Sequence, residues 1–391
     1  MPRPKKLIVQ KYLTDDQVSS LEGKWIDESY MKMPVIDYNC DVFYKDEEGK
    51  EVLLLKFRKN AFKFDSIRKG WESYKDLAKP SRGRGASAGP INTDSTYWKK
   101  RNIVNTNKWS TGYLNPNGNK MKDELSILSL SELQNKIDLL NIKYTPEEYN
   151  NKDDLIYLII KKNNGVSKMK VNNQVASNPI GFYEAGKNFA DLPCRLTHFT
   201  RTNFEKYNNG LPFIQKIDQL FKRLIPDAHE RQLERANLKS HLKIPKTCFS
   251  TVTINRNFRT AMHRDAGDFK GGFGNLTVIE RGKYHGGYTI FPQYGVAIDL
   301  RNNDFVAMDV HQWHCNTPLY ETEEDKKFNE TMEPVFKDNP EVGTAGIYEN
   351  YTRISFVCYL REKIAKCPDK IDPRFLTKSG HSKIPKEEIK N

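Results

Sequence analysis

Apolar and polar residues alternate along this chain in two rhythms, one typical of strands and one of helices. Residues 41–58 read as a β-hairpin, because two alternating runs flank the polar turn Lys45–Lys50. Apolar residues on one helical stripe predict a core-packed helix over Leu211–Pro226. From Thr247 onward, β-rich runs separated by Gly and Asn indicate a β-sandwich or jelly roll. The predicted strands are Cys248–Ile254, Leu276–Glu280, Tyr288–Phe291, Val296–Leu300, Phe305–Val310 and Ile354–Leu360.

A polar and then helical stretch interrupts these β-rich parts. Residues 102–120 are rich in Asn and read as a linker, and a second polar stretch, Lys161–Asn178, closes the interruption. Between them, apolar residues recur at helical spacing in two short runs, each preceded by capping residues. This hairpin, over residues 122–163, resembles a SAP-type module, a small fold associated with DNA binding. Because it holds 6 Lys against 8 Asp and Glu, a plain structural insertion is the alternative.

Composition adds a basic charge that is concentrated in one place. The 391 residues include 63 Lys and Arg against 50 Asp and Glu, a net charge of +13, which suits nucleic acid, an anionic membrane or mere solubility. Residues 56–101 alone hold 13 basic and 4 acidic residues, with aromatic residues interleaved. Such a segment predicts contacts to a polynucleotide, and the alternative is a solvated edge of a folded domain. The candidate DNA-binding residues are Arg58, Lys59, Arg82 and Arg84.

Other features of the sequence bear on where the protein resides. No run approaches the ~18 consecutive apolar residues of a membrane span, and no apolar stretch follows the basic start as in a secretory signal. The six cysteines are scattered without a CxxC pair, which predicts reduced thiols and neither a zinc finger nor a disulfide framework. We therefore expect a soluble nuclear or cytoplasmic protein that is not secreted.

Candidate chemistry begins at His263-Arg-Asp265, after a strand-like run. Residues i and i+2 of an extended chain point to the same side, so His263 and Asp265 can bind one metal ion. A non-haem iron(II) oxygenase needs two His and one carboxylate, so the third ligand must come from a later strand. His311 and His314 are both available, and the position of His314 at a strand exit favours it.

A later strand carries a candidate anion site. Arg353 and Ser355 lie at i and i+2 of an apolar run, so their side chains share one face. A guanidinium can bind a carboxylate bidentately, and a hydroxyl can add a hydrogen bond to the same group. The pair therefore suits the far carboxylate of a dicarboxylate such as 2-oxoglutarate.

Several blocks together resemble the TET/JBP family of dioxygenases. They are Thr251–Asp268, Gly272–Leu276, His285–Pro292, His311–Thr317 and Arg353–Tyr359. The resemblance implies an α+β fold with a double-stranded β-helix core. It implies oxidation of the 5-methyl group of 5-methylcytosine or thymine in DNA, with Fe(II), 2-oxoglutarate and O₂. Because this methyl group lies in the base stack of a duplex, we expect the base to be flipped out, and we expect the enzyme to be a monomer.

Carried over to this sequence, the resemblance assigns roles to individual residues. It makes His263, Asp265 and His314 the iron ligands and Arg353 the partner of 2-oxoglutarate, and it puts Asn255 beside the co-substrate. Asp268 either caps the turn after the strand or, as in an ascorbate-using branch of the family, contacts ascorbate in place of 2-oxoglutarate.

The resemblance also sets an expected domain organisation. It divides the chain into an N-terminal extension (1–39), a first part of the oxygenase domain (40–110), the SAP-like insertion (122–163), the oxygenase core (170–367) and a mobile tail (368–391).

Two other functions are the alternatives to oxidation of a base in DNA. One is a dioxygenase that acts on protein or RNA, and the other, if the ligand set were broken, is a DNA-binding protein without activity.

Overall fold

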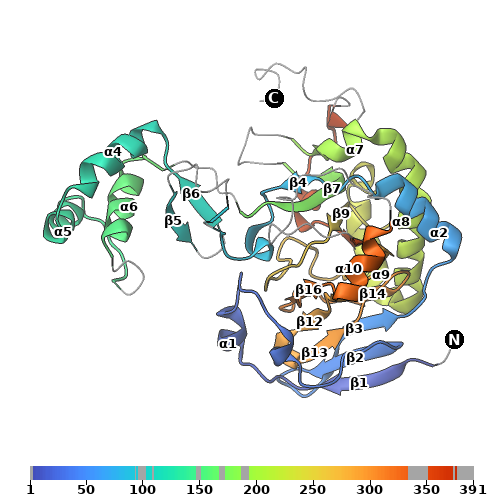
Figure 1. Ribbon diagram of the computed structural model, residues 1–391. Coiled ribbons are helices and arrows are strands. Elements are labelled where there is room, and N and C mark those ends of the chain that lie inside the picture. Colours follow the sequence, from blue (N-terminus) through green and yellow to red (C-terminus); the bar gives the residue numbers. More distant parts are fainter. Residues whose placement is uncertain are drawn as a thin grey trace.

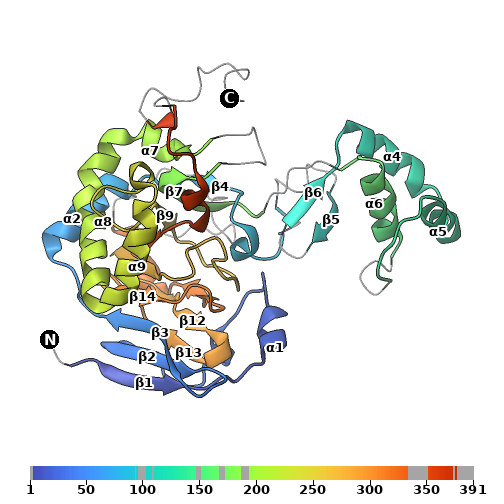
Figure 2. The same ribbon diagram turned by 180° about the vertical axis from the view of Figure 1, so that it is seen from behind.

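The computed structural model divides into a large body and a small helical lobe that stands away from it (Figures 1 and 2). It describes most of the chain between residues 3 and 376. The tail after residue 376 and the end of the basic segment, 96–101, lie outside the described residues. The described ranges are 3–92, 94–95, 103–107, 110–146, 151–166, 172–185, 193–332, 351–372 and 375–376.

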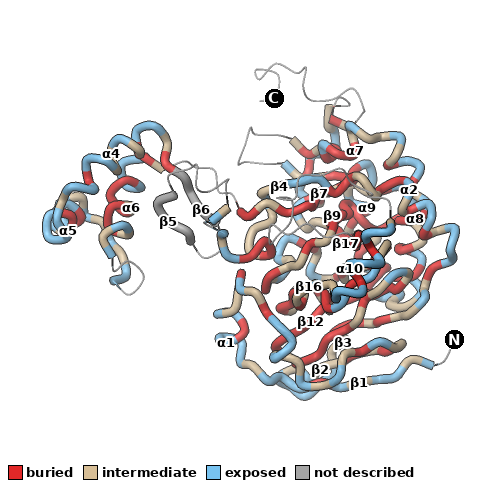
Figure 3. Tube along the Cα trace, viewed as in Figure 1, coloured by how far each residue is buried: buried red, intermediate tan, exposed pale blue. Residues whose placement is uncertain are grey.

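A large mixed sheet forms the centre of the body. Among the described residues it has ten strands, and its central strands are buried along much of their length (Figure 3). All neighbours pair antiparallel except β1 and β2, which are parallel. The order is β1 (Lys5–Val9), β2 (Cys40–Lys45), β3 (Glu51–Arg58), β14 (Phe305–Met308), β10 (Gly274–Arg281), β17 (Thr352–Tyr359), β9 (Thr251–Arg256), β7 (Val175–Tyr183) and β4 (Pro80–Ser81), with β8 (Arg195–Leu196) paired to β7.

Helices cover one face of this sheet. They are α2 (Phe64–Tyr74), α7 (His198–Thr202), α8 (Phe204–Leu224) and α9 (Pro226–Asn237). The predicted helix over 211–226 is confirmed, although α8 begins earlier and contains Pro212. Alternate residues of the strands, such as Ile254 and Phe356, pack against Phe213 and other apolar residues of α8. Helices α2 and α8 approach closely, because Gly210 leaves room for the buried ring of Tyr74.

A second, smaller sheet faces the opposite side of the large one. It consists of β13 (Val296–Ile298), β12 (Thr289–Phe291) and β15 (Cys315–Asn316), with the pair β11 (His285–Gly286) and β16 (Leu319–Tyr320) nearby in the sequence. Phe291 and Val296 share one apolar cluster with Leu55 and Val306 of the large sheet, so the two sheets pack face to face. An α+β fold is confirmed, and its closed double-stranded β-helix topology stays a prediction.

Residues before the first hairpin belong to this body. Strand β1 adds an edge to the large sheet, and α1 (Asp15–Ser19) and the 3₁₀ turn η1 (Glu28–Tyr30) follow it. Val18 and Ile26 pack on the outer side of the small sheet, against Ile290 and Cys315. The segment therefore covers the small sheet. A short helix, α10 (Glu323–Glu330), follows β16.

The lobe corrects one prediction and confirms another. Instead of a linker over 102–120, the chain forms a hairpin and then a helix, because Asn115 accepts a hydrogen bond from the Gly118 N–H and Pro116 suits the first helical turn. The predicted helical hairpin is confirmed, and its helices share a separate apolar core. The lobe contains β5 (Ile103–Asn107), β6 (Ser110–Tyr113), α4 (Pro116–Ser126), α5 (Leu130–Leu139) and α6 (Lys152–Lys162).

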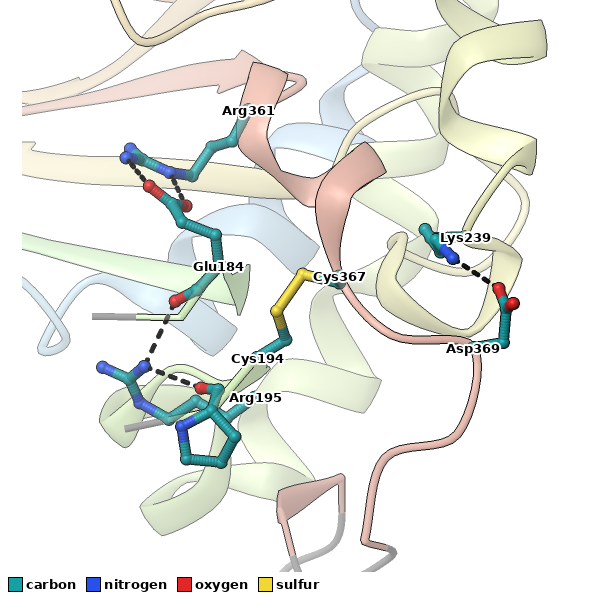
Figure 4. Close-up of a disulfide and its surroundings, with 8 residues drawn as sticks. Glu184, Cys194, Arg195, Lys239, Arg361, Cys367 and Asp369 are labelled. Atoms are coloured by element: carbon teal, nitrogen blue, oxygen red, sulfur yellow. Dashed lines mark hydrogen bonds and ion pairs between the residues drawn. A yellow bond between two sulfur atoms is a disulfide. The ribbon is translucent and has the colours of Figure 1, made fainter. Parts of the chain in front are cut away.

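The prediction that all six cysteines are reduced is wrong. Cys194 and Cys367, 173 residues apart, form a disulfide (Figure 4). The fold brings these two residues together, whereas the spacing of cysteines in the sequence can reveal only pairs that are close along the chain. The other four cysteines are free and buried. In the part of the chain that the structure describes, no helix combines the length and apolar character needed to cross a membrane.

Candidate active site

Three predicted ligands meet between the two sheets. His263 and Asp265 lie in the loop after β9, and His314 directly precedes β15. Two backbone hydrogen bonds of 3.1 Å join His263 and His314 as an antiparallel bridge, which fixes their separation. The Nε2 atom of each imidazole lies 3.8 Å from an oxygen of Asp265. Every pair of ligand atoms in this group is within 4.8 Å.

The imidazoles are oriented by their second nitrogen atoms. Nδ1 of His263 lies 2.8 Å from the Ala261 carbonyl oxygen, and Nδ1 of His314 lies 2.9 Å from that of Gln312. A ring that donates from Nδ1 to a carbonyl presents the lone pair of Nε2. Burial and the neighbouring His263 lower the pKa of His314 to about 4, so this ring is neutral at pH 7. The donor set fits a site for a divalent metal with two His and one carboxylate.

His311 does not join this group. Its backbone N–H donates to Asp309, and its Nε2 is buried without a hydrogen bond. Among the described residues, His314 and not His311 therefore completes the set with His263 and Asp265.

The ligands open onto a cavity of about 330 Å³ whose floor is the inner face of β17 and β9. Arg353, Ser355 and Asn255 all line it, as their alternation along the strands predicts. Arg353 is only 4% exposed, and its Nε is buried without a hydrogen-bond partner. A buried guanidinium whose N–H donor has no acceptor lowers the stability of the fold unless a bound anion accepts that hydrogen bond. Arg353 therefore fits a carboxylate ligand.

Asn255 lies where predicted, but its side chain is already engaged. Its amide donates to the Ser355 hydroxyl at 3.2 Å, and its oxygen accepts from the Ser177 hydroxyl. These bonds cross three neighbouring strands and orient the Ser355 hydroxyl at the cavity floor. Asn255 thus acts on the cavity through Ser355.

Asp268 also lines the cavity. Burial raises the pKa of its carboxyl well above the usual value, and Asp265 raises it further, whereas Arg361 lowers it. The turn is closed by the backbone N–H of Asp268, which donates to the Asp265 carbonyl. Among the described residues no hydrogen bond ties the Asp268 carboxyl to that turn, so the carboxyl is available to the cavity.

The cavity wall also contains residues that sequence reasoning missed, and Tyr359 and Arg361 are two of them. Both continue the alternation that begins at Arg353, so extending it to the end of the strand would have found Tyr359. The Tyr359 hydroxyl lies 3.0 Å from that of Thr253. Arg361 forms a bidentate ion pair with Glu184 at the end of β7.

The four predicted DNA-binding residues separate into two groups. Arg58 pairs with Asp41 at 2.7 Å, and Lys59 pairs with the buried Asp304 at 2.6 Å, so both have structural partners in the body. Arg84 lines the cavity, and Arg82 lies two residues before it in the same loop. Among the described residues of the basic segment, this loop therefore reaches the cavity.

Comparison with known proteins covers the same region. Residues 178–362 match the Tet_JBP family model, the oxygenase domain of the 2OGFeDO superfamily. The bifunctional helicase and thymine dioxygenase JBP2 of Leishmania major is 32% identical over 182 residues, which cover 46% of this chain and 14% of that protein. Thymine dioxygenase JBP1 of Trypanosoma brucei brucei is 31% identical over 173 residues, 44% of this chain and 20% of that protein. The chain thus spans a small part of these relatives.

Solved structures are more distant. NgTET1 in complex with 5mC DNA has a TM-score of 0.43 and 9% identity, covering 92% of this chain and 84% of that one. The collagen prolyl hydroxylase vCPH of Paramecium bursaria Chlorella virus-1 has a TM-score of 0.21 and 13% identity, covering 48% of this chain and 79% of that one. The family model and the sequence relatives confirm the predicted resemblance: residues 178–362 are similar to the oxygenase domain of the Tet/JBP family within the 2OGFeDO superfamily.

Proposed function

We propose that this protein is an Fe(II)- and 2-oxoglutarate-dependent dioxygenase that oxidises the 5-methyl group of a pyrimidine in DNA. The observation that carries the proposal is the group His263, Asp265 and His314, which opens onto the same cavity as Arg353, whose buried Nε lacks a hydrogen-bond partner. The names of the relatives, which are thymine dioxygenases, support a methylated base as substrate.

Each cavity residue would have a distinct task. His263, Asp265 and His314 would hold iron(II), which with 2-oxoglutarate and O₂ supplies the oxidant in such sites. Arg353 would bind the far carboxylate of 2-oxoglutarate bidentately, and Ser355, held by Asn255, would donate a hydrogen bond to it. The two facing sheets would exclude water and so protect the oxidant from side reactions.

The position of the cavity bears on how DNA would bind. A 5-methyl group in duplex DNA lies in the base stack, whereas the ligands lie between two packed sheets. The base would therefore have to be flipped out, with Arg82 and Arg84 contacting the phosphates beside it. We assign this contact to the body of a monomer and not to the lobe, because residues 103–162 hold 8 basic and 8 acidic residues and carry no net charge. Such a DNA substrate suits a nuclear or cytoplasmic protein.

The test is direct turnover. The protein is loaded with Fe(II) without oxygen, then given O₂ and 2-oxoglutarate with duplex DNA that contains thymine alone or 5-methylcytosine, and the nucleosides are analysed by mass spectrometry. We expect a hydroxymethyl product from at least one base and none from the His263→Ala variant. Unchanged nucleosides in every arm, with 2-oxoglutarate still consumed when RNA or protein is supplied, would favour those substrates instead.

The same assay should also be run with ascorbate in place of 2-oxoglutarate. The available Asp268 carboxyl in the cavity favours ascorbate as the alternative. If ascorbate alone supports modification and Asp268→Asn abolishes it, the assignment of 2-oxoglutarate is wrong. If only 2-oxoglutarate supports it, the ascorbate alternative is excluded.

A further inference from the structure

The loop that carries Asp265 is held by the segment that follows β17. The Phe269 N–H donates to the Leu360 carbonyl at 2.9 Å, and the Glu362 N–H donates to the Gly267 carbonyl at 3.0 Å. These two bonds align the loop 265–269 with residues 360–362. The segment then turns into the short 3₁₀ helix η5 (Glu362–Lys366) and ends at Cys367.

Two ties fix this segment to the end of β7 and the start of β8. Arg361 forms its bidentate pair with Glu184, and Cys367 is bonded to Cys194 (Figure 4). Burial alone would raise the pKa of the Glu184 carboxyl, but Arg361 outweighs it and holds that pKa below its usual value, so the pair is ionic. Arg195, next to Cys194, donates to the Glu184 carbonyl at 3.3 Å, which connects the two ties.

The disulfide lies in a small apolar cluster and not on the surface. Cys194 is 2% exposed and Cys367 is 4% exposed, and both pack with Phe182, Leu196 and Ile364. The disulfide fixes the end of the segment that follows β17, and this segment is hydrogen-bonded to the loop that carries Asp265. Loss of the disulfide can therefore change the position of a metal ligand.

We propose that the Cys194–Cys367 disulfide and the Glu184–Arg361 pair together form a brace that positions the loop 265–269, and with it Asp265 as a metal ligand and Arg361 as a wall of the cavity. Glu184, Cys194 and Cys367 are thus positioning residues that touch neither metal nor substrate. The proposal rests on the proposed function only in identifying the metal as iron.

The test uses the full chain without turnover. In the Cys194→Ser, Cys367→Ser double variant, hydrogen exchange of the Phe269 and Glu362 amides in the metal-free protein should become at least tenfold faster, while β2 and β3 keep their protection. Fe(II) affinity should fall by about 10- to 100-fold, as it does when groups that orient metal ligands are lost. Glu184→Gln, which keeps the disulfide, should shift both quantities in the same direction.

A matched control is the ion pair between Lys239 and Asp369, which ties the same C-terminal segment beyond Cys367 (Figure 4). Asp369→Asn should leave loop exchange and Fe(II) affinity unchanged. If the double variant does not fold, the disulfide of the wild-type protein is reduced with a dithiol instead. The dithiol is oxidised to a disulfide as Cys194 and Cys367 become thiols. Alkylation of both thiols shows that reduction is complete, and hydrogen exchange of the Phe269 and Glu362 amides is then measured.

Two results would overturn the brace. One is unchanged exchange at Phe269 and unchanged Fe(II) affinity in a protein whose mass shows the disulfide to be absent. The other is an equal effect of Asp369→Asn. Neither measurement needs product formation. If the loop is loosened in the variants but the wild-type protein oxidises no base, the proposed brace is supported and only the proposed function is refuted.

Discussion

Replacing Gly210 with Ala tests how tightly the helical layer supports the sheet. A Cβ atom at this position of α8 would lie 2.1 Å from Cζ and 2.3 Å from the hydroxyl oxygen of Tyr74 on α2. Tyr74 cannot easily withdraw, because it is fully buried, donates to the Tyr207 carbonyl at 3.1 Å and packs on Phe356 of β17 at a ring distance of 5.9 Å.

The magnitude follows from opposing effects. Ala in place of a helical Gly contributes about 1 kcal/mol of stability. Overpacking costs about 1–3 kcal/mol, and a displaced Tyr74 hydroxyl left without its partner costs about 1–3 kcal/mol more. The two costs outweigh the gain, so we expect Gly210→Ala to lower the free energy of unfolding by about 3 kcal/mol.

Urea unfolding measures this difference, with the midpoint expected to fall while the slope stays constant. Gly83→Ala is the control, because a Cβ there meets no atom within 4 Å and the change should stay within about 0.5 kcal/mol. If Gly210→Ala were as stable as the wild type, the close approach of α2 and α8 would be refuted.

Three further predictions concern the cavity. Arg353→Lys loses the bidentate geometry and should raise the KM for 2-oxoglutarate by about 10- to 100-fold in steady-state assays, whereas an unchanged KM would contradict its role. In the metal-free protein the pKa of His314 is lowered to about 4, so as the pH falls the unfolded chain takes up a proton before the folded chain does, and the contribution of His314 to stability is full above about pH 6.5 and is lost towards pH 4. Urea unfolding at pH 7 and at pH 4.5 should therefore show a loss of up to about 3 kcal/mol in the free energy of unfolding, and His314→Gln should remove this difference. The Arg82→Ala, Arg84→Ala variant should weaken binding of methylated and unmethylated duplexes alike and reduce the salt dependence of log K by about 2, and an unchanged slope would exclude this loop from the phosphate contacts.

Patterns within one strand were predictable from sequence. The alternation of β17 predicted that Arg353 and Ser355 share a face, and both line the cavity. The HxD spacing and the strand exit at His314 likewise predicted which groups converge, because the side-chain direction in an extended backbone depends only on local geometry.

Features that depend on distant contacts were not predictable in this way. The disulfide joins residues whose proximity results from the pairing of β7 with β8 and β9 and from the turn after β17. The Asn-rich stretch before Asn115 predicted a linker, since composition does not reveal a hairpin held by backbone hydrogen bonds. Arg58 and Lys59 look like free cations in sequence, but their partners Asp41 and Asp304 are supplied by the fold.

Strand β17 has a consequence for how the nascent chain folds. It lies between β10 and β9, so it is the strand that joins the two halves of the large sheet, yet it is the last strand in the described sequence. Until residue 359 has been translated, β9 and β10 each present an unpaired edge, and such edges invite association with other chains. A ribosome-bound intermediate would hold two half-sheets, and the cavity wall that carries Arg353 would be completed only as the domain itself closes.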